Sequence, residues 1–193
     1  MAEKSRIEPL GKHHDRAAFS SGSDPLDQYF KNQAGQAVEK KLAAVFVLTP
    51  DGKTVHGYFT LSSFVVKLDE LPEKIAKKLT KMGEVPATLI GRLARSVAVK
   101  GKAVGELLLA DALKKALLGS ATVASWAVVV DAKDEKAAAF YQRYGFARFP
   151  HTPNRLFLPM NSIRELFEEQ EASVVPAATE VTSAAEPQPP EQS

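Results

Sequence analysis

The residues best suited to chemistry lie in one glycine-containing stretch, GRLARSVAVKGKAVG, which runs from Gly91 to Gly105. A strand predicted over 87–99 passes through a short turn into a helix predicted to begin at Val104. The first backbone N–H groups of a helix have no internal partners, and with the helix dipole they favour an anion. Lys100 and Lys102 add positive charge beside them. The stretch therefore predicts a pyrophosphate-binding turn, although a tight strand-to-helix turn without a ligand has the same pattern.

A tyrosine is the second candidate for chemistry. Tyr141 lies in a helix predicted from Asp134 to Tyr144 and closed by Gly145. Its hydroxyl can donate a proton or a hydrogen bond to a reacting group. A tyrosine on an amphipathic helix is more often a core residue, so spacing alone favours the structural interpretation.

Several other catalytic groups are excluded or unsupported. The chain has no cysteine, which excludes disulfides, thiolate metal sites and a cysteine nucleophile. Neither paired carboxylates nor a His–Asp constellation accompanies the two candidate segments. His13 and His14 are adjacent, but neighbouring side chains need not converge on a metal, so we predict no metal site.

Length and composition indicate one domain followed by a tail. A chain of 193 residues with 45% hydrophobic content can bury one sizeable core. Residues 171–193 contain four glutamates, no lysine or arginine, and repeated proline and alanine, a composition that cannot offset its ordering entropy. We therefore predict a folded domain over 1–170 and a disordered acidic tail over 171–193.

Charge and hydropathy suggest where the protein works. The formal net charge is +2, so without the four negative charges of the tail the domain would carry +6. A basic domain suits an anionic cofactor or a nucleic acid. No run approaches the ~20 apolar residues that a membrane span needs, and no basic start precedes an apolar stretch. We expect a cytoplasmic protein with no membrane segment.

The elements that must position these residues alternate between strands and helices. Besides those already named, we predict a helix after Ser23 reaching Leu42, strands over 43–48 and 55–66 joined by a turn, a helix over 73–81, a helix over 104–118, a buried strand over 123–130, two short strands over 146–158, and a last helix starting at Ser162 with a capping box to Glu165. The alternation in the second half favours an α/β arrangement.

Two segments resemble motifs of the GNAT superfamily of N-acetyltransferases. KGKAVG, from Lys100 to Gly105, is similar to the acetyl-CoA loop Gln/Arg-x-x-Gly-x-Gly/Ala, with Lys100 in place of glutamine or arginine and Ala103 in place of the middle glycine. AAFYQRYGF, over 138–146, is similar to the late motif A-x-x-F-Y-x-x-x-G-F. In that family, the tyrosine at the position of Tyr141 is a general acid that faces the CoA sulfur.

A third set of motifs resembles a subfamily of these enzymes. FSSGSDPLDQYF over 19–30, GYFTLS over 57–62 and GRLA over 91–94 look like the GNAT toxins encoded beside ribbon-helix-helix antitoxins, and the likeness covers roughly residues 6–160. It implies a GNAT fold of mixed α+β class, with a central, mostly antiparallel sheet, one parallel splayed strand pair and flanking helices. It also implies a toxin that acetylates aminoacyl-tRNA and inhibits translation, with a ribbon-helix-helix antitoxin and a second copy as partners.

The resemblance assigns roles to particular residues. Tyr141 would assist departure of the CoA sulfur, and an amide of the central strand would meet the oxyanion of the thioester. The residues expected to bind acetyl-CoA are Leu93, Ala94, Arg95, Ser96, Val97, Lys100, Gly101, Lys102, Ala103, Val104 and Gly105. For the RNA we select basic side chains, namely Arg92, Lys40, Lys41 and Lys78, each of which could instead be solvated surface. An α-amine titrates near ~7.7–8.0, so no strongly tuned base is required.

Two other functions remain open from the sequence. The first is a GNAT acetyltransferase that acts on a different amine, on a protein or a small molecule, because the acetyl-CoA motifs do not distinguish acceptors. The second is a catalytically silent GNAT fold that serves as a binding module, which is motivated by the departures at Lys100 and Ala103.

Overall fold

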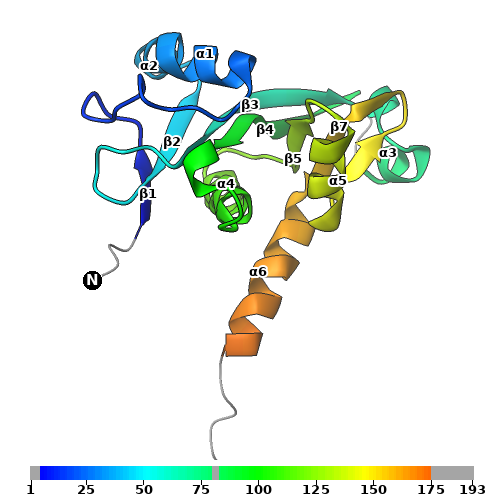
Figure 1. The fold of residues 1–193 in the computed structure, drawn as a ribbon. Coiled ribbons are helices and arrows are strands. Elements are labelled where there is room, and N and C mark those ends of the chain that lie inside the picture. The colour runs from blue at the N-terminus through cyan, green and yellow to red at the C-terminus, as the bar shows by residue number, and fades with distance from the viewer. Residues whose placement is uncertain (1–4, 80–82, 175–193) are drawn as a thin grey trace, which may run out of the picture.

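The computed structural model describes residues 5–79 and 83–174 (Figure 1). The elements in chain order are β1 (Arg6–Pro9), α1 (Asp24–Asn32), α2 (Ala34–Glu39), β2 (Ala44–Thr49), β3 (Gly57–Lys67), the 3-10 turn η1 (Leu68–Glu70), α3 (Glu73–Leu79), β4 (Glu84–Arg95), the 3-10 turn η2 (Val97–Val99), α4 (Val104–Ser120), β5 (Ala127–Asp131), α5 (Glu135–Arg143), β6 (Ala147–Phe149), β7 (Thr152–Pro159) and α6 (Met160–Val174).

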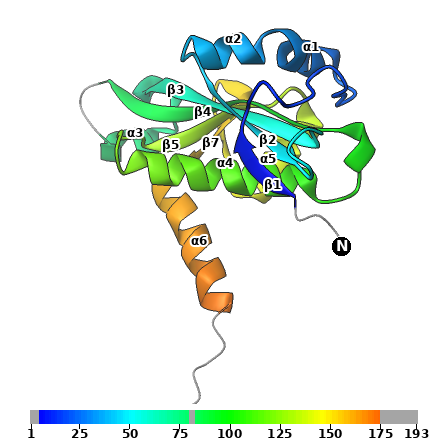
Figure 2. The same ribbon diagram turned by 90° about the vertical axis from the view of Figure 1, so that its left-hand side faces the viewer.

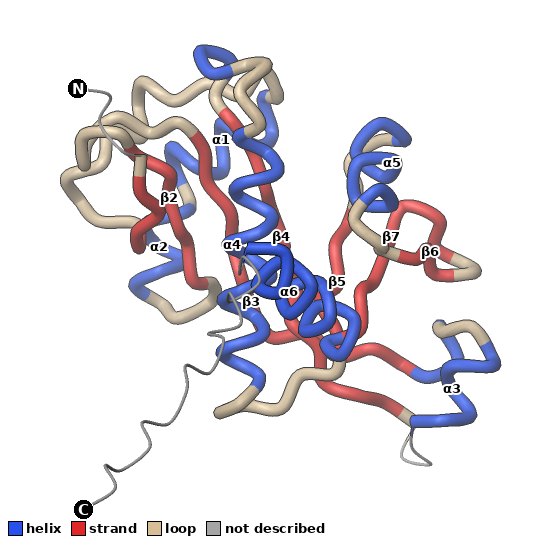
Figure 3. Tube along the Cα trace, turned by 90° about the horizontal axis from the view of Figure 1, so that it is seen from below, coloured by secondary structure: helices blue, strands red, loops and turns tan. Residues whose placement is uncertain are grey.

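Seven strands form one sheet in the order β1-β2-β3-β4-β5-β7-β6. Every neighbouring pair is antiparallel except β4 and β5, which are parallel and pair only where Thr88–Ile90 meets Val128–Val130. Beyond Ile90, β4 keeps its pairing with β3 as far as Arg95, and Figure 3 shows β4 and β5 diverging. The predicted mostly antiparallel sheet with a splayed parallel pair is confirmed, and the splay leaves a gap beside the end of β4.

Helices cover both faces of this sheet. Figures 1 and 2 place α1 and α2 on one side and α4 on the other. Successive side chains of a strand point to opposite faces, and the buried neighbours Tyr58 and Phe59 of β3 accordingly belong to two separate cores. Tyr58 stacks on Phe30 of α1, with ring centroids 4.4 Å apart, whereas Phe59 belongs to the core that includes Leu108 of α4.

The structure corrects several predicted boundaries. The helix predicted to reach Leu42 is two helices separated at Gln33, and β1 was not predicted because a four-residue strand is too short to show a period. The strand predicted over 87–99 ends at Arg95, since Ser96 caps η2 by accepting a hydrogen bond from the Ala98 amide. The strand predicted over 123–130 begins only at Ala127.

The last helix also differs from its prediction. It begins at Met160, whose amide donates to the Trp126 carbonyl, so Ser162 lies inside the helix and the predicted capping box is wrong. The helix continues to Val174 through a run of good helix formers that includes Glu171, four residues into the predicted tail. The remainder of that tail, 175–193, lies outside the described residues.

None of the helices within 5–79 and 83–174 has both the length and the apolar content that crossing a membrane requires.

Candidate functional site

One cavity of about 620 Å³ brings the two predicted segments together. It lies beside the part of β4 that has parted from β5, with the start of α4 on one side and α5 on another. The lining residues are Leu93, Ala94 and Arg95 from β4; Gly101, Ala103, Val104, Gly105 and Glu106 from the turn and α4; Lys133, Asp134, Lys136, Ala137, Phe140 and Tyr141 from α5 and the loop before it; Ser21 and Ser23 from the loop that leads into α1; and Leu26 from α1 itself.

The start of α4 offers backbone donors to this cavity. The first hydrogen bond of the helix joins the Leu107 amide to the Ala103 carbonyl, so the amides of Val104, Gly105 and Glu106 precede it and have no partner within the helix. Their partial positive charge favours an anion. A Cβ built on Gly105 would lie 3.7 Å from the Phe140 ring, an ordinary van der Waals contact, so only a side chain larger than that of alanine would fill the space between α4 and α5 at this point.

Ala103 adopts a backbone conformation that favours glycine. It caps α4 with φ +40°, in the left-handed region, which costs a residue with a Cβ about 1 kcal/mol or more. This is the position where the resemblance expects glycine. The helix start therefore forms here at the expense of local strain.

We predict that Ala103→Gly raises the free energy of unfolding by about 0.5–1 kcal/mol, because it relieves that strain. Chemical denaturation measures the change. The matched control is Ala110→Gly, the same substitution at an exposed position inside α4, which should lower the stability by about 1 kcal/mol. Equal destabilisation by both substitutions would contradict the strain at Ala103.

Tyr141 is held with its ring buried and its side chain at the cavity. It is only 7% exposed, and its ring packs edge-on against Phe140 and beside Phe146, with centroids 5.3 and 5.5 Å away. Burial raises the pKa of its hydroxyl to about 12. The hydroxyl therefore keeps its proton near neutral pH and is suited to donating a hydrogen bond into the cavity.

Arg92 lies on the face of β4 that carries α1. Its guanidinium carbon is 3.6 Å from the centroid of the Tyr29 ring, a stacking contact that holds the planar group in place. Within residues 5–79 and 83–174 no carboxylate lies at ion-pair distance from it. A fixed cation of this kind is well suited to a phosphate.

The structure brings together only part of the predicted set. The predicted cofactor-binding residues that line the cavity are Leu93, Ala94, Arg95, Gly101, Ala103, Val104 and Gly105, whereas Ser96, Val97, Lys100 and Lys102 do not line it. Lys40 and Lys41 follow α2, and Lys78 lies on α3, which Figures 1 and 2 place at the opposite end of the sheet. Lys78 therefore lies apart from the cavity, whereas Lys41 lies beside β3, the strand that pairs with β4.

A second hollow of about 640 Å³ lies elsewhere, where α2 meets β2 and β3. Of the predicted site residues it contains only Lys41. It holds neither a helix start nor the tyrosine, so we place the candidate site in the cavity beside α4 and α5.

Sequence reasoning missed several lining residues. Lys133 and Lys136 precede or begin α5, and Phe140 lies one turn further along it; nothing in their own spacing distinguished them from solvated surface or core. Ser21 and Ser23 belong to the motif FSSGSDPLDQYF, which identified a resemblance without placing its residues. Fold topology alone brings this loop beside β4.

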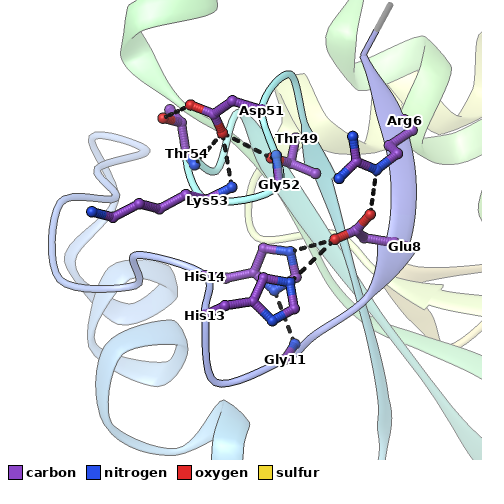
Figure 4. A network of polar contacts seen from close by, with 10 residues as sticks. All are labelled: Arg6, Glu8, Gly11, His13, His14, Thr49, Asp51, Gly52, Lys53 and Thr54. Carbon is purple, nitrogen blue, oxygen red and sulfur yellow. Dashed lines mark hydrogen bonds and ion pairs between the residues drawn. The ribbon is translucent and has the colours of Figure 1, made fainter.

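The adjacent histidines lie next to Glu8, a neighbour the sequence did not indicate (Figure 4). Oε1 of Glu8 is 2.9 Å from Nε2 of buried His14 and 3.4 Å from Nε2 of His13. The Gly11 amide donates to Nδ1 of His14, so in the neutral ring Nε2 carries the hydrogen that Glu8 accepts. A metal ion would need the lone pair of that Nε2. The hydrogen bonds therefore favour a structural cluster that ties β1 to the following loop.

This cluster makes stability depend on pH. The hydrogen bond from Arg6, and then the one from His13, hold the pKa of the Glu8 carboxyl at about 2. A carboxyl whose pKa is depressed by folding stabilises the protein above its unfolded pKa, near ~4.3, and loses that contribution as the pH falls through the folded value. We predict that Glu8→Gln lowers the melting temperature near pH 7 and that the difference narrows below about pH 5. A difference that stays constant down to about pH 3 in thermal melts would contradict this.

The chain is similar in sequence to a known protein. The chain is 34% identical over 175 residues to a protein of Sinorhizobium fredii (strain NBRC 101917 / NGR234) named probable toxin TacT, which covers 86% of this chain and 96% of the relative. No family model matches the chain.

Two solved structures are similar as well. One is AtaT complexed with acetyl-methionyl-tRNAfMet, with a TM-score of 0.79, 27% identity, and coverage of 85% of this chain and 99% of that one. The other is a tyrosine-to-phenylalanine mutant of AtaT bound to the C-terminus of the antitoxin AtaR and acetyl-CoA, with a TM-score of 0.73, 25% identity, and coverage of 86% and 99%.

Proposed function

Because the chain belongs to the GNAT toxins of type II toxin–antitoxin systems, we propose that it transfers acetyl from acetyl-CoA to the α-amine of aminoacyl-tRNA and thereby inhibits translation. The observation that carries the proposal is the single cavity in which the unpaired amides at the start of α4 and the hydroxyl-bearing Tyr141 meet. The similar AtaT was solved with an acetylated aminoacyl-tRNA and with acetyl-CoA, which supports the same donor and acceptor class here.

The residues of the cavity fit acetyl-CoA. Amides of Val104, Gly105 and Glu106 would hold the pyrophosphate, with the open space at Gly105 allowing close approach. Glu106 is the one acidic side chain in the first turn of α4. Its Oε1 lies 4.0 Å from Nη2 of Arg143, and this ion pair offsets its negative charge. Acetyl-CoA supplies the thioester whose carbonyl carbon the amine attacks.

The chain's own groups would then act on the acceptor and the leaving group. An α-amine with a pKa near ~7.7–8.0 is partly neutral at cellular pH, so the site needs no strong base. An amide of β4 near Leu93 would stabilise the oxyanion. With a pKa raised to about 12, the Tyr141 hydroxyl would donate a hydrogen bond to the departing sulfur rather than transfer its proton completely. The sulfur would leave as the thiolate, which would then take up the proton that the attacking nitrogen loses as the amide forms.

We also propose the partners and the setting. An antitoxin, of the ribbon-helix-helix class, would bind the toxin, as AtaR binds AtaT, and the toxin would form a homodimer in the cytoplasm. The acetyltransferase domain would comprise residues 1–170 and the acidic tail 171–193, with α6 reaching four residues into that tail. On the RNA side, the stacked Arg92 is the best placed cation, and Lys40, Lys41 and Lys78 would contact more distant phosphates.

Acceptor competition tests the proposed function. The protein and acetyl-CoA are incubated with equal amounts of charged tRNA and of a lysine-containing peptide, and the acetylated products are separated by mass spectrometry. We expect acetyl on the charged tRNA and none on the peptide. Acetylated peptide with unmodified tRNA would support the alternative of another amine. Release of CoA without acetylation of either acceptor would show only a weak acetyl-CoA hydrolase.

Salt dependence provides a second test. Neutralising tRNA phosphates releases counterions, and each contact contributes a slope of about −0.7 to −0.9 to the plot of log affinity against log salt. We predict that the KM for charged tRNA rises steeply with salt and that Arg92→Ala makes the slope shallower by about one contact. Turnover that does not respond to salt would contradict RNA as the acceptor.

A further inference from the structure

The loop before α1 is organised by one buried carboxylate. Asp27 is 8% exposed, and its Oδ1 accepts hydrogen bonds from the Ser21 amide at 2.8 Å and the Ser21 hydroxyl at 2.5 Å. Its Oδ2 accepts a longer one, at 3.3 Å, from the Ser20 hydroxyl. No basic side chain in the described part of the chain forms an ion pair with this carboxylate. Hydrogen bonds from two consecutive serines therefore take the place of an ion pair for the Asp27 carboxylate.

The same loop is hydrogen-bonded to the start of η2, directly after β4. The Val97 amide donates to the Ser20 carbonyl at 2.9 Å. Gly22 follows with φ +78°, and a Cβ there would meet the Val97 side chain at 3.4 Å. Because Ser21 and Ser23 line the cavity, these contacts hold Ser21 at a defined position in the cavity wall.

The bond to Asp27 determines what Ser21 presents to the cavity. A carboxylate can only accept, so the hydroxyl hydrogen of Ser21 is committed to Asp27. The Ser21 oxygen accepts one bond from the Ser23 amide at 3.3 Å, and one lone pair remains. Toward a further ligand, the Ser21 hydroxyl is therefore an acceptor and not a donor.

We propose that Ser21 accepts a hydrogen bond from the α-amine of the aminoacyl group and that Asp27 acts as the residue that positions it, an inference that rests on the proposed function. A neutral amine has two N–H groups and one lone pair. Donation of one N–H to Ser21 holds the nitrogen in place while its lone pair stays free to attack. A substrate hydroxyl, with one hydrogen, could make the same bond, so the site selects for a donor and disfavours groups that only accept.

Steady-state kinetics with charged tRNA test this proposal. Ser21→Ala is expected to lower kcat/KM about 10-fold, the effect of one hydrogen bond in a closed site, while the dissociation constant of acetyl-CoA changes less than about 2-fold. Ser21→Thr keeps the hydroxyl and should restore kcat/KM to within about 3-fold of wild type. Asp27→Asn keeps an oxygen that accepts but weakens it, so we expect an intermediate loss of about 3-fold.

The matched control is Ser20→Ala. It also removes a hydroxyl from Asp27, but Ser20 is exposed and does not line the cavity, so kcat/KM should stay within about 2-fold of wild type. Equal effects of Ser20→Ala and Ser21→Ala on kcat/KM would overturn the role of Ser21. So would a loss of kcat/KM in Ser21→Ala that accompanies a lower melting temperature and is not restored by Ser21→Thr. Neither outcome would overturn the proposed function. Wild-type protein that leaves charged tRNA unmodified would overturn the proposed function together with this inference.

Discussion

Replacing Tyr141 with phenylalanine is expected to lower kcat for acetyl transfer about 100-fold, at the low end of what one preorganised hydrogen-bond donor contributes to a transition state. The dissociation constant of acetyl-CoA should stay within about 3-fold, because the ring packing against Phe140 and Phe146 is kept. Stopped-flow or quenched single-turnover measurements separate the chemical step from binding.

Tyr144→Phe is the control for this experiment. Tyr144 is one turn away from Tyr141 at the end of the same helix, is half-buried, and does not line the cavity. It should keep kcat within about 2-fold. Equal losses of kcat and of acetyl-CoA affinity in Tyr141→Phe, or similar losses in the two variants, would assign Tyr141 to packing and not to chemistry.

Gly105→Leu is expected to weaken acetyl-CoA binding about 30-fold, which corresponds to about 2 kcal/mol. The leucine side chain would extend past the position of a Cβ into the space between α4 and α5, where a pyrophosphate would contact the amides at the start of α4. Leucine is a better helix former than glycine, so the helix itself should not be lost. Isothermal titration calorimetry with acetyl-CoA measures the effect.

Gly105→Ala separates blocking from other effects of the substitution. Its methyl group would make an ordinary contact, 3.7 Å from Phe140, and should change the dissociation constant less than about 3-fold. Comparable binding by the leucine and alanine variants would show that the ligand does not pass this side of α4.

Local patterns predicted the two segments of the candidate site whose turn or helix lies within a few consecutive residues. The turn before Val104 and the helix that carries Tyr141 could be predicted because each combines its chemistry with a helix boundary in a few residues. The splay of β4 and β5 followed from the family resemblance, since periodicity does not report which strands pair. The sequence showed that alanine stands at position 103 where the motif has glycine, but only the backbone shows that Ala103 has a left-handed φ.

Contacts between distant segments could not be predicted in this way. Ser21 reaches the cavity because the loop before α1 forms hydrogen bonds with Asp27 and with Val97 of η2, and no sequence period encodes that approach. Glu8 and His14 come together across a turn closed by the Gly11 amide. Lys78 matched the composition of an RNA-binding surface, but its helix α3 lies apart from the cavity, because basic composition does not determine which face a helix occupies.

The most direct test of aminoacyl-tRNA as the acceptor is transfer of labelled acetyl from acetyl-CoA to a pool of charged tRNA, followed by mild alkaline release of the amino acids. The proposed function predicts labelled N-acetylamino acids from charged tRNA, none from uncharged tRNA, and a strongly reduced yield with Tyr141→Phe. Charged tRNA that stays unlabelled while the protein binds acetyl-CoA would contradict it and leave an acetyltransferase that acts on another amine.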